Sequence, residues 1–421
     1  MRGVWSCPNV LLKPSSPRSD PKLEKRALNW SYVLVGVADA TLLPFVPLFL
    51  LQRGMSAPLI GAVLAAAALA SLAAGMSWAY LADRRLRAER IIPIATIAAA
   101  LTALLLAVTH GAVMLTVAIV VLWLARAPFM LLDPIALRRL INSRRTDYAR
   151  IRLRMSAGWA ASVTLVGGVY QLFSLRLMPF VYAPLTLLFG FWVWRALKPP
   201  PAAEKIAAPV TSGPRRLGKL PLALLGFLAS TFLLGASLAA TQNFLVLQIS
   251  ALGGGAFLVG AAAAFQAMAE IPTMGYTHVL TRYMSHRTLF ALGCCIYLVT
   301  FIAWAFVTSA FVAAALKLAV GVGFALTYVA SVMLADELSP ARLRATGQAL
   351  FKSVAFGLAP IAGTFAGGLV YGTLGARAMF LGSTVLVAGA GLIAVLALPS
   401  RARRTAEEPG PAAPEPAPVT P

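Results

Sequence analysis

The feature that most constrains this chain is a succession of apolar runs, each about as long as a bilayer is thick. A helix needs about 20 predominantly apolar residues to cross the hydrocarbon core. Twelve such runs can be placed between residues 27 and 398. They begin near Ala27, Ala57, Ile91, Ala112, Met155, Met178, Leu220, Gly255, Leu289, Ser309, Ala345 and Ala378. Because a helix satisfies its own backbone hydrogen bonds in lipid, the runs predict membrane-spanning helices and an all-α membrane protein.

Composition agrees with lipid as the solvent for most of the chain. Only 12% of the 421 residues are charged and 59% are hydrophobic, whereas soluble domains carry about 25% charged residues. The net charge of +22 lies in short basic clusters between apolar runs. No sequence motif that reads DNA or RNA accompanies these clusters, so no nucleic-acid partner is expected.

Polar segments divide the chain into two halves of six spans. Residues 198–219, which include Pro199, Pro200, Pro201, Arg215 and Arg216, form the most polar internal stretch and are expected to be a cytoplasmic linker. The linker separates a bundle at 27–197 from one at 220–398. Residues 1–26 are expected to form a cytoplasmic arm, and the Pro/Ala/Glu-rich residues 399–421 a disordered cytoplasmic tail.

The distribution of Lys and Arg predicts the orientation in the membrane. Thirty of the 36 lie in the amino-terminal arm, the tail and the loops that follow even-numbered spans. Loops after odd-numbered spans contain only Arg53, Arg176 and Arg377. Since cytoplasmic segments are rich in Lys and Arg, both termini are expected in the cytoplasm, and the protein in a bacterial cytoplasmic membrane.

Six ionisable residues lie inside the predicted spans. Each costs at least about 2.5 kcal/mol at the centre of a membrane helix, so each needs water, a partner or a function. They are Asp39, Arg126, Asp133, Glu270, Lys317 and Lys352. Arg126 and Asp133 are seven residues apart, so they are expected on one face of the fourth span. Together these charges predict a water-filled crevice.

Span seven has no charge but carries two adjacent amides, Gln242 and Asn243, near its middle. Such side chains either bind a polar solute or form hydrogen bonds between helices, and the sequence leaves both open. The adjacent Cys294 and Cys295 have no metal-ligand spacing. No metal and no cofactor are therefore expected.

Several local sequences are similar to those of one transporter superfamily. These are Leu81 to Arg87, Leu43 to Phe45, Asp147 to Arg152, Ser156 to Trp159, Ala269 to Pro272 and Arg342 to Leu350. On these residues the chain resembles the major facilitator superfamily, in the branch that contains lactose permease, the phenylpropionate transporter and nucleoside–proton symporters. The resemblance implies two six-helix bundles, each with inverted repeats, and alternating access to a site between them.

The resemblance also implies roles for individual residues. The counterparts of Arg152, Trp159 and Glu270 contact the sugar in lactose permease, and the counterpart of Asp133 is paired with that arginine. Asp83 and Arg84 occupy the positions of an aspartate and an arginine in the superfamily's loop signature, where these two residues hold helix ends together. Ala79 and Leu86 replace the usual glycines of that signature.

For each of these residues a structural alternative remains. Glu270 could simply neutralise Lys317 or Lys352, and Trp159 could be packing. Arg152 could belong to a basic loop, as could Asp83 and Arg84.

One departure from the branch concerns proton coupling. The span-ten histidine and glutamate of the permease correspond to about Val320 and Gly323, so its coupling chemistry cannot be carried over. If protons are coupled, the carboxylates within the spans, Asp39, Asp133 or Glu270, must carry them.

The sequence thus predicts a transporter rather than an enzyme. The expected activity is proton symport of a sugar, nucleoside or organic acid by a monomer. Substrate contacts are expected from Arg126, Arg152, Trp159, Gln242, Asn243 and Glu270, and a charge network from Asp39, Asp133, Glu270, Lys317 and Lys352. Two alternatives remain: proton-driven efflux of drugs or metabolites, and a membrane-embedded lipid-handling enzyme.

Overall fold

The computed structural model describes residues 21–84, 87–140, 145–198, 221–340 and 343–398, and these are helical with no strand among them. The elements of the first half are α1 (Pro21–Ala40), α2 (Val46–Gln52), α3 (Ala57–Arg84), α4 (Ala88–Val108), α5 (Ala112–Arg126), η1 (Ala127–Leu131), α6 (Leu132–Arg139), α7 (Arg145–Leu172), η2 (Leu175–Leu177) and α8 (Met178–Ala196). The predicted all-α class is confirmed.

The second half repeats this pattern of long and interrupted helices. Its elements are α9 (Leu222–Ala251), α10 (Ala256–Tyr283), α11 (His286–Phe306), α12 (Ala310–Ala315), α13 (Lys317–Glu337), α14 (Arg344–Ser353), the π-helix η4 (Val354–Leu358) and α15 (Ala359–Ala397). Gly375 has a φ of +86° inside α15 and divides it into two rods.

Nine helical segments in the described residues are long and apolar enough to cross a membrane by length and composition. One of them, Thr346–Ala397, contains the break at Gly375 and thus holds two rods. The rod α1–α2 and the rod α7 are helical but carry charges at the ends where spans one and five begin. Nine of the described segments thus have the length and composition of a span, and α1–α2, α7 and the second rod of Thr346–Ala397 are helical at the positions of the other three predicted spans.

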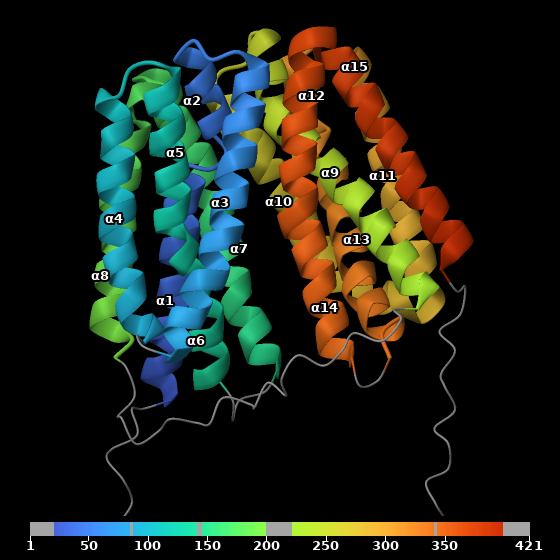
Figure 1. Cartoon of the computed structure of the whole chain (residues 1–421), viewed down its shortest axis with the longest axis horizontal. Coiled ribbons are helices and arrows are strands. Elements are labelled where there is room, and N and C mark those ends of the chain that lie inside the picture. Colours follow the sequence, from blue (N-terminus) through green and yellow to red (C-terminus); the bar gives the residue numbers. More distant parts are fainter. Residues whose placement is uncertain (1–20, 85–86, 141–144, 199–220, 341–342, 399–421) are drawn as a thin grey trace, which may run out of the picture.

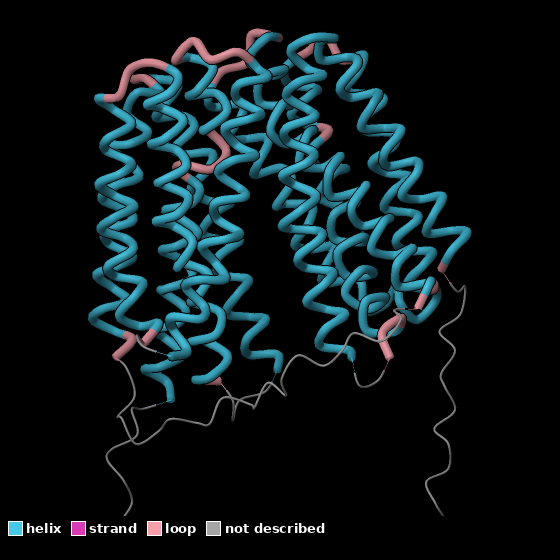
Figure 2. Tube along the Cα trace, in the orientation of Figure 1, coloured by secondary structure: helices cyan, strands magenta, loops and turns pink. Residues whose placement is uncertain are grey.

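The two halves are separate bundles that touch at one face and part at the other. Figures 1 and 2 show α1 beginning and α15 ending at the same face, here called the termini face. The bundles diverge toward this face and meet at the opposite one, here called the far face. They meet mainly through two helix pairs, α3 with α15 and α7 with α10, and α2 also contacts α9.

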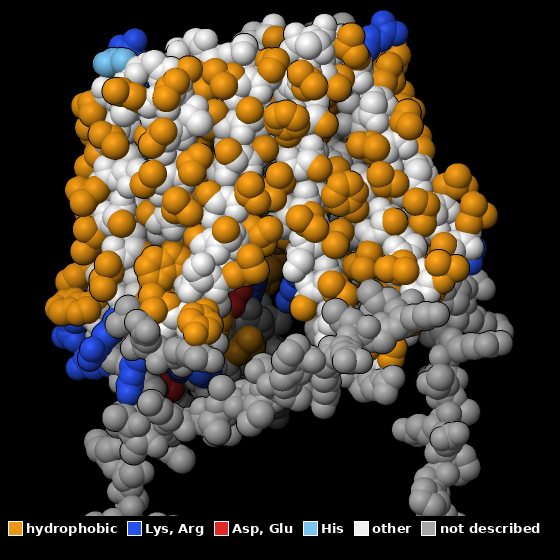
Figure 3. Space-filling view, viewed as in Figure 1, with side chains coloured by type: hydrophobic (Ala, Val, Ile, Leu, Met, Phe, Trp, Pro, Cys, Tyr) orange, Lys and Arg blue, Asp and Glu red, His pale blue; other side chains and the backbone are white. Residues whose placement is uncertain are grey.

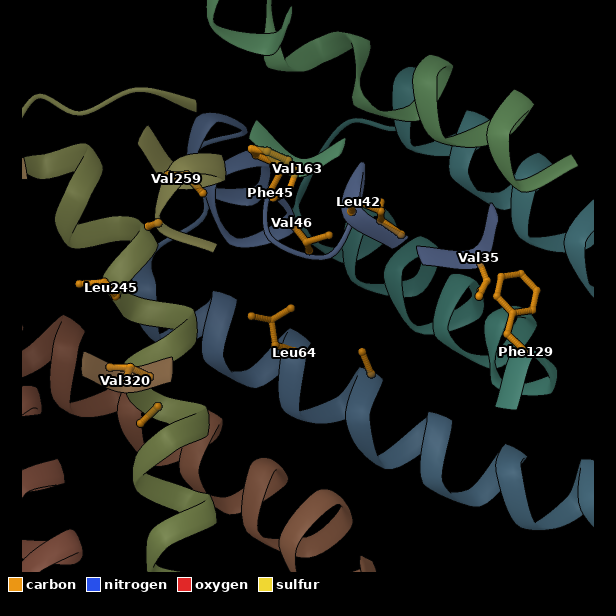
Figure 4. Packing of buried hydrophobic residues seen from close by; sticks show 14 of the residues in the cluster. Val35, Leu42, Phe45, Val46, Leu64, Phe129, Val163, Leu245, Val259 and Val320 are labelled. Carbon is orange, nitrogen blue, oxygen red and sulfur yellow. The ribbon is translucent and has the colours of Figure 1, made fainter. Parts of the chain in front are cut away.

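Glycines make the contact at the far face close. A Cβ added to Gly61, in the second turn of α3, would lie 2.8 Å from Cα of Gly368 in α15. A Cβ on Gly260, near the start of α10, would overlap the carbonyl oxygen of Val163 in α7. Small residues let helix backbones approach this closely, and Figure 4 shows buried side chains of both halves in one apolar cluster, among them Val163 and Val259.

The outer surface is apolar, as expected of helices in lipid. Large hydrophobic side chains are exposed along both bundles, and Figure 3 shows them covering the outside. At the termini face the same view shows an opening between the bundles, with Lys, Arg, Asp or Glu side chains inside it.

Some helix boundaries differ from the prediction. α7 begins at Arg145, ten residues before the apolar run at Met155, because a helix can extend into water with its charged residues. α1 likewise begins at Pro21, inside the predicted arm. The predicted linker and tail, and the first 20 residues of the arm, lie outside the described residues apart from Lys198 in the linker.

Candidate functional site

Each bundle holds a cluster of polar side chains, and that of the first bundle has two parts. In the inner part, the guanidinium Nη2 of Arg126 lies 2.5 Å from Oδ1 of Asp39, and both side chains are about nine-tenths buried. Nε of Arg126 donates a hydrogen bond to the hydroxyl of Tyr182 on α8 (3.1 Å). The guanidinium also lies over the rings of Trp123 and Phe129. Arg126 therefore joins spans one, four and six.

The second part of this cluster lies closer to the termini face and is open to water. Asp133 accepts a hydrogen bond from the hydroxyl of Tyr32 (2.5 Å) and lies 3.4 Å from Nη1 of Arg152 on α7. The side chains of Arg152 and Asp133 are 51% and 38% exposed. The pair is thus loosely held and accessible, in contrast to Asp39 and Arg126.

Helix register explains why these contacts occur in two tiers. Asp39 follows Tyr32 by seven residues on α1, and Asp133 follows Arg126 by seven in span four. Seven residues are about two turns. Since α1 and span four run in opposite directions, Asp39 meets Arg126 and Tyr32 meets Asp133. Arg126 and Asp133 both reach α1, as expected of residues on one face.

The cluster of the second bundle lies between α10 and α13. Nζ of Lys317, which is 6% exposed, donates to Oε1 of Gln266 (2.9 Å). Glu270 lies one turn beyond Gln266 on the same helix and is half-buried. Within the described parts of the chain, Glu270 makes no hydrogen bond and no ion pair within 4.0 Å. Its carboxylate is therefore available to a solute or a proton.

The remaining predicted residues have different surroundings. Lys352 is exposed at the end of α14, and Gln242 is half-buried on α9. Nδ2 of Asn243 donates to the Ala239 carbonyl (2.9 Å) and to the Thr364 hydroxyl on α15 (3.1 Å). Asn243 thus links two helices of one bundle, which is the packing alternative left open by the sequence.

Trp159 lies on α7, two turns from Arg152, and is half-buried against the apolar core. The neighbouring Gly158 permits α7 to pack on α1, because a Cβ there would lie 2.8 Å from the carbonyl oxygen of Val33. Asp83 and Arg84 end α3, but their side chains lie outside the described residues. Among the residues that are described, no three His, Cys, Asp or Glu side chains could hold a metal ion together.

Three polar partners could not be predicted from the charges in the sequence. They are Tyr32, Tyr182 and Gln266, which are uncharged side chains within apolar runs. For Gln266 a signal was present, because it precedes Glu270 by four residues and so shares its helix face. For Tyr182 no local signal existed.

These observations define a class of protein: a helical membrane transporter with two bundles and a polar crevice between them. A family model described as the MFS_1 like family matches residues 27–382. The chain belongs to this family, and therefore to the major facilitator superfamily.

Known proteins support this assignment. The maltose permease of Geobacillus stearothermophilus is 27% identical over 389 residues, which cover 90% of this chain and 95% of the permease. The crystal structure of the nucleoside transporter NupG matches with a TM-score of 0.74 at 18% identity, covering 89% of this chain and 98% of NupG. A bacterial homologue of the human lysosomal transporter Spinster matches with a TM-score of 0.65 at 14% identity, covering 90% and 97%.

Proposed function

We propose that this protein is a proton-coupled symporter that moves a sugar, a nucleoside or an organic acid across the membrane by alternating access. The observation that carries the proposal is the placement of two polar clusters in two bundles that part at the termini face (Figures 1 and 3). A solute that bridges both clusters would draw the bundles together, and this is what coupling binding to closure requires.

Arg152 and Glu270 are the proposed solute contacts on the two sides. The Arg152 side chain is half exposed and only loosely held by Asp133, so most of its five N–H donors are free for hydroxyl or carboxylate groups. Trp159, two turns along the same helix, offers a flat apolar surface beside it. Glu270 supplies an acceptor from the second bundle.

Among the three candidate proton carriers, the surroundings favour Glu270. Protonation of Asp39 would leave Arg126 charged and buried without its counter-charge, and breaking such a pair costs about 3–5 kcal/mol. Asp133 already accepts a hydrogen bond from Tyr32 and contacts Arg152. Glu270 forms no ion pair within 4.0 Å among the described residues. Its charge acts on the buried Lys317 only at longer range, and Lys317 keeps its hydrogen bond to Gln266 when Glu270 gains a proton.

The relatives suggest which solutes to test first. One is named a maltose permease and another a nucleoside transporter. Sugars and nucleosides share several hydroxyl groups, which Arg152 and Glu270 can bind as donor and acceptor.

The test is uptake into proteoliposomes with an imposed pH gradient, screened over sugars, nucleosides and organic acids. Accumulation should need an acidic exterior, and Glu270→Gln should abolish accumulation while the protein still folds. Asp336→Asn is the matched control, because this carboxylate forms only an exposed ion pair with Arg344. Unchanged accumulation by Glu270→Gln would rule out its proposed role.

The same vesicles distinguish the proposed symport from the alternative of proton-driven efflux. In vesicles with an acidic interior, protons leave down their gradient, so an antiporter would accumulate solute inside the vesicles and a symporter would not. No observation on the described residues favours the third alternative, a lipid-handling enzyme.

A further inference from the structure

A pocket inside the second bundle is not used by the mechanism proposed above. It lies between α9, α13 and the α14–η4 segment, which borders the gap between the bundles in Figure 1. Its walls are mostly apolar and aromatic. The residues that line it include Thr231, Leu238, Phe324, Tyr328, Phe351 and Phe356.

Aromatic rings from two spans, α13 and the α14–η4 segment, form a continuous series along this pocket. Phe324 and Tyr328 on α13 are stacked, with centroids 5.7 Å apart and planes at 8°. Tyr328 meets Phe356 edge to face at 6.0 Å, and Phe356 meets Phe351 in the same way at 6.2 Å. Rings arranged in this way present both faces and edges, the two surfaces that a further flat ring prefers.

The pocket is open on one side. Phe356 is 55% exposed, although large apolar side chains in a bundle interior are normally buried. Leu238, Phe324 and Tyr328 are half-buried. The space open to the centres of water-sized spheres is about 50 Å³, enough for about three or four waters. A ring would enter by one edge and rest against Phe356 with the other.

A buried hydroxyl in the pocket indicates that the bound ring carries a polar group on the edge that enters the pocket. Thr231 is 2% exposed and lines the pocket, yet its hydroxyl has no hydrogen-bond partner among the described residues. A buried polar group left unpaired costs about 1–3 kcal/mol. A solute atom that donates to or accepts from Thr231 would remove this cost.

The backbone beside the pocket is irregular at the same place. Residues Val354–Leu358 form a π-helix between α14 and α15, and such turns occur often at functional sites. The irregular turn carries Phe356 and so sets the position of the exposed ring.

We propose that this pocket is a subsite for a flat, unsaturated ring of the transported solute, with Thr231 as the hydrogen-bond partner of a polar atom on the ring edge. The inference rests on the proposed function and narrows its substrate class. The solute would carry hydroxyl or carboxylate groups for Arg152 and Glu270 and a ring for the second bundle. Nucleosides, aromatic acids and aryl glycosides have this design, whereas plain sugars do not.

The test uses three pairs of compounds that differ in the ring: uridine and ribose, phenyl β-glucoside and glucose, benzoate and acetate. Their binding is measured as protection of the purified full-length protein against thermal unfolding. We expect at least one ring-bearing compound to protect at lower concentration than its partner without the ring. Equal protection by both members of every pair, or protection by none of the ring-bearing compounds, would overturn the subsite.

Two variants localise the effect. Thr231→Val keeps the shape and removes the hydroxyl, and should weaken binding of the ring-bearing compound about two- to tenfold. Phe356→Ala should weaken it by a similar factor, and leave binding of the ring-free partner unchanged. Phe365→Ala is the control, because Phe365 is also more than half exposed but lies on α15 outside the pocket. Equal effects of Phe356→Ala and Phe365→Ala would also overturn the proposal.

Uptake measurements distinguish this failure from failure of the proposed function. Proton-driven accumulation of a solute, together with equal protection by the ring-bearing and ring-free members of every pair, would leave the symporter intact and remove the subsite. Ring-selective binding without any proton-driven uptake would keep the subsite and remove proton symport.

Discussion

Arg126 and Asp39 form a buried ion pair, 2.5 Å between Nη2 and Oδ1, that joins the fourth and first spans. An ion pair inside a membrane bundle has no net charge, and each of the two side chains gives the other the polar contact that water would otherwise supply. The geometry separates this pair from the exposed contact between Arg152 and Asp133 in the same bundle. The two contacts therefore have different expected roles, one structural and one in binding.

Asp39→Asn should lower the stability of the folded protein, because Arg126 would remain charged and buried. Removing one partner of a buried pair costs about 3–5 kcal/mol, and the double variant Asp39→Asn with Arg126→Gln should recover much of the loss. The measurement is the unfolding temperature of the purified variants. Proton dependence of uptake should persist in the double variant. Loss of this proton dependence would indicate that Asp39 is a proton carrier.

Arg152→Lys should raise the KM for the solute about tenfold, with little change in stability. Lysine is a point charge and cannot reproduce the forked donor geometry of arginine. Arg154→Lys is the matched control, since Arg154 is two residues away on α7 and also exposed. If both variants changed KM equally, Arg152 would be one basic residue among several at this end of the helix.

The neighbouring amides of span seven should differ in their effects. Asn243→Ala removes a hydrogen bond between α9 and α15 and should cost about 1 kcal/mol of stability, while leaving KM unchanged. Gln242→Ala should leave stability unchanged and raise KM if this half-buried amide contacts the solute. The reverse pattern would exchange the two roles, and unfolding curves with uptake kinetics measure both.

Closure of the far face should depend on the glycines between the bundles. Gly61→Val would place side-chain atoms where Cα of Gly368 lies, so the two bundles could no longer close there. We expect cysteines introduced beside the helix contacts of the far face, which are closed in this structure, to become accessible to membrane-impermeant thiol reagents. Gly382→Val is the control, because a Cβ at Gly382 meets no atom within 4 Å, and increased labelling in both variants would contradict the explanation.

Reporter fusions test the orientation. Both ends of the chain should report a cytoplasmic location, because 30 of 36 Lys and Arg lie in segments on that side. Opposite locations of the two ends would require an odd number of spans and would remove the two-bundle transporter.

Much of the fold could be predicted from the sequence because the bilayer imposes length and polarity on each segment separately. Apolar run length predicted the rods, and α7 began earlier only because charged residues continued the helix into water. The ionisable residues at Asp39, Asp133 and Glu270 were detectable for the same reason, since a charge in an apolar run is conspicuous.

What only the tertiary structure decided is which side chains meet. Arg126 contacts Asp39 rather than Asp133, and Tyr182 completes the pair from an uncharged span. The hydroxyl of Thr231 has no hydrogen-bond partner among the residues that the structure describes, although it lies in an aromatic pocket. Local sequence determines whether a segment enters the membrane, because that depends on the segment and the lipid alone. Contacts between helices depend on the register and rotation of both partners, and these are set by packing across residues far apart in the chain.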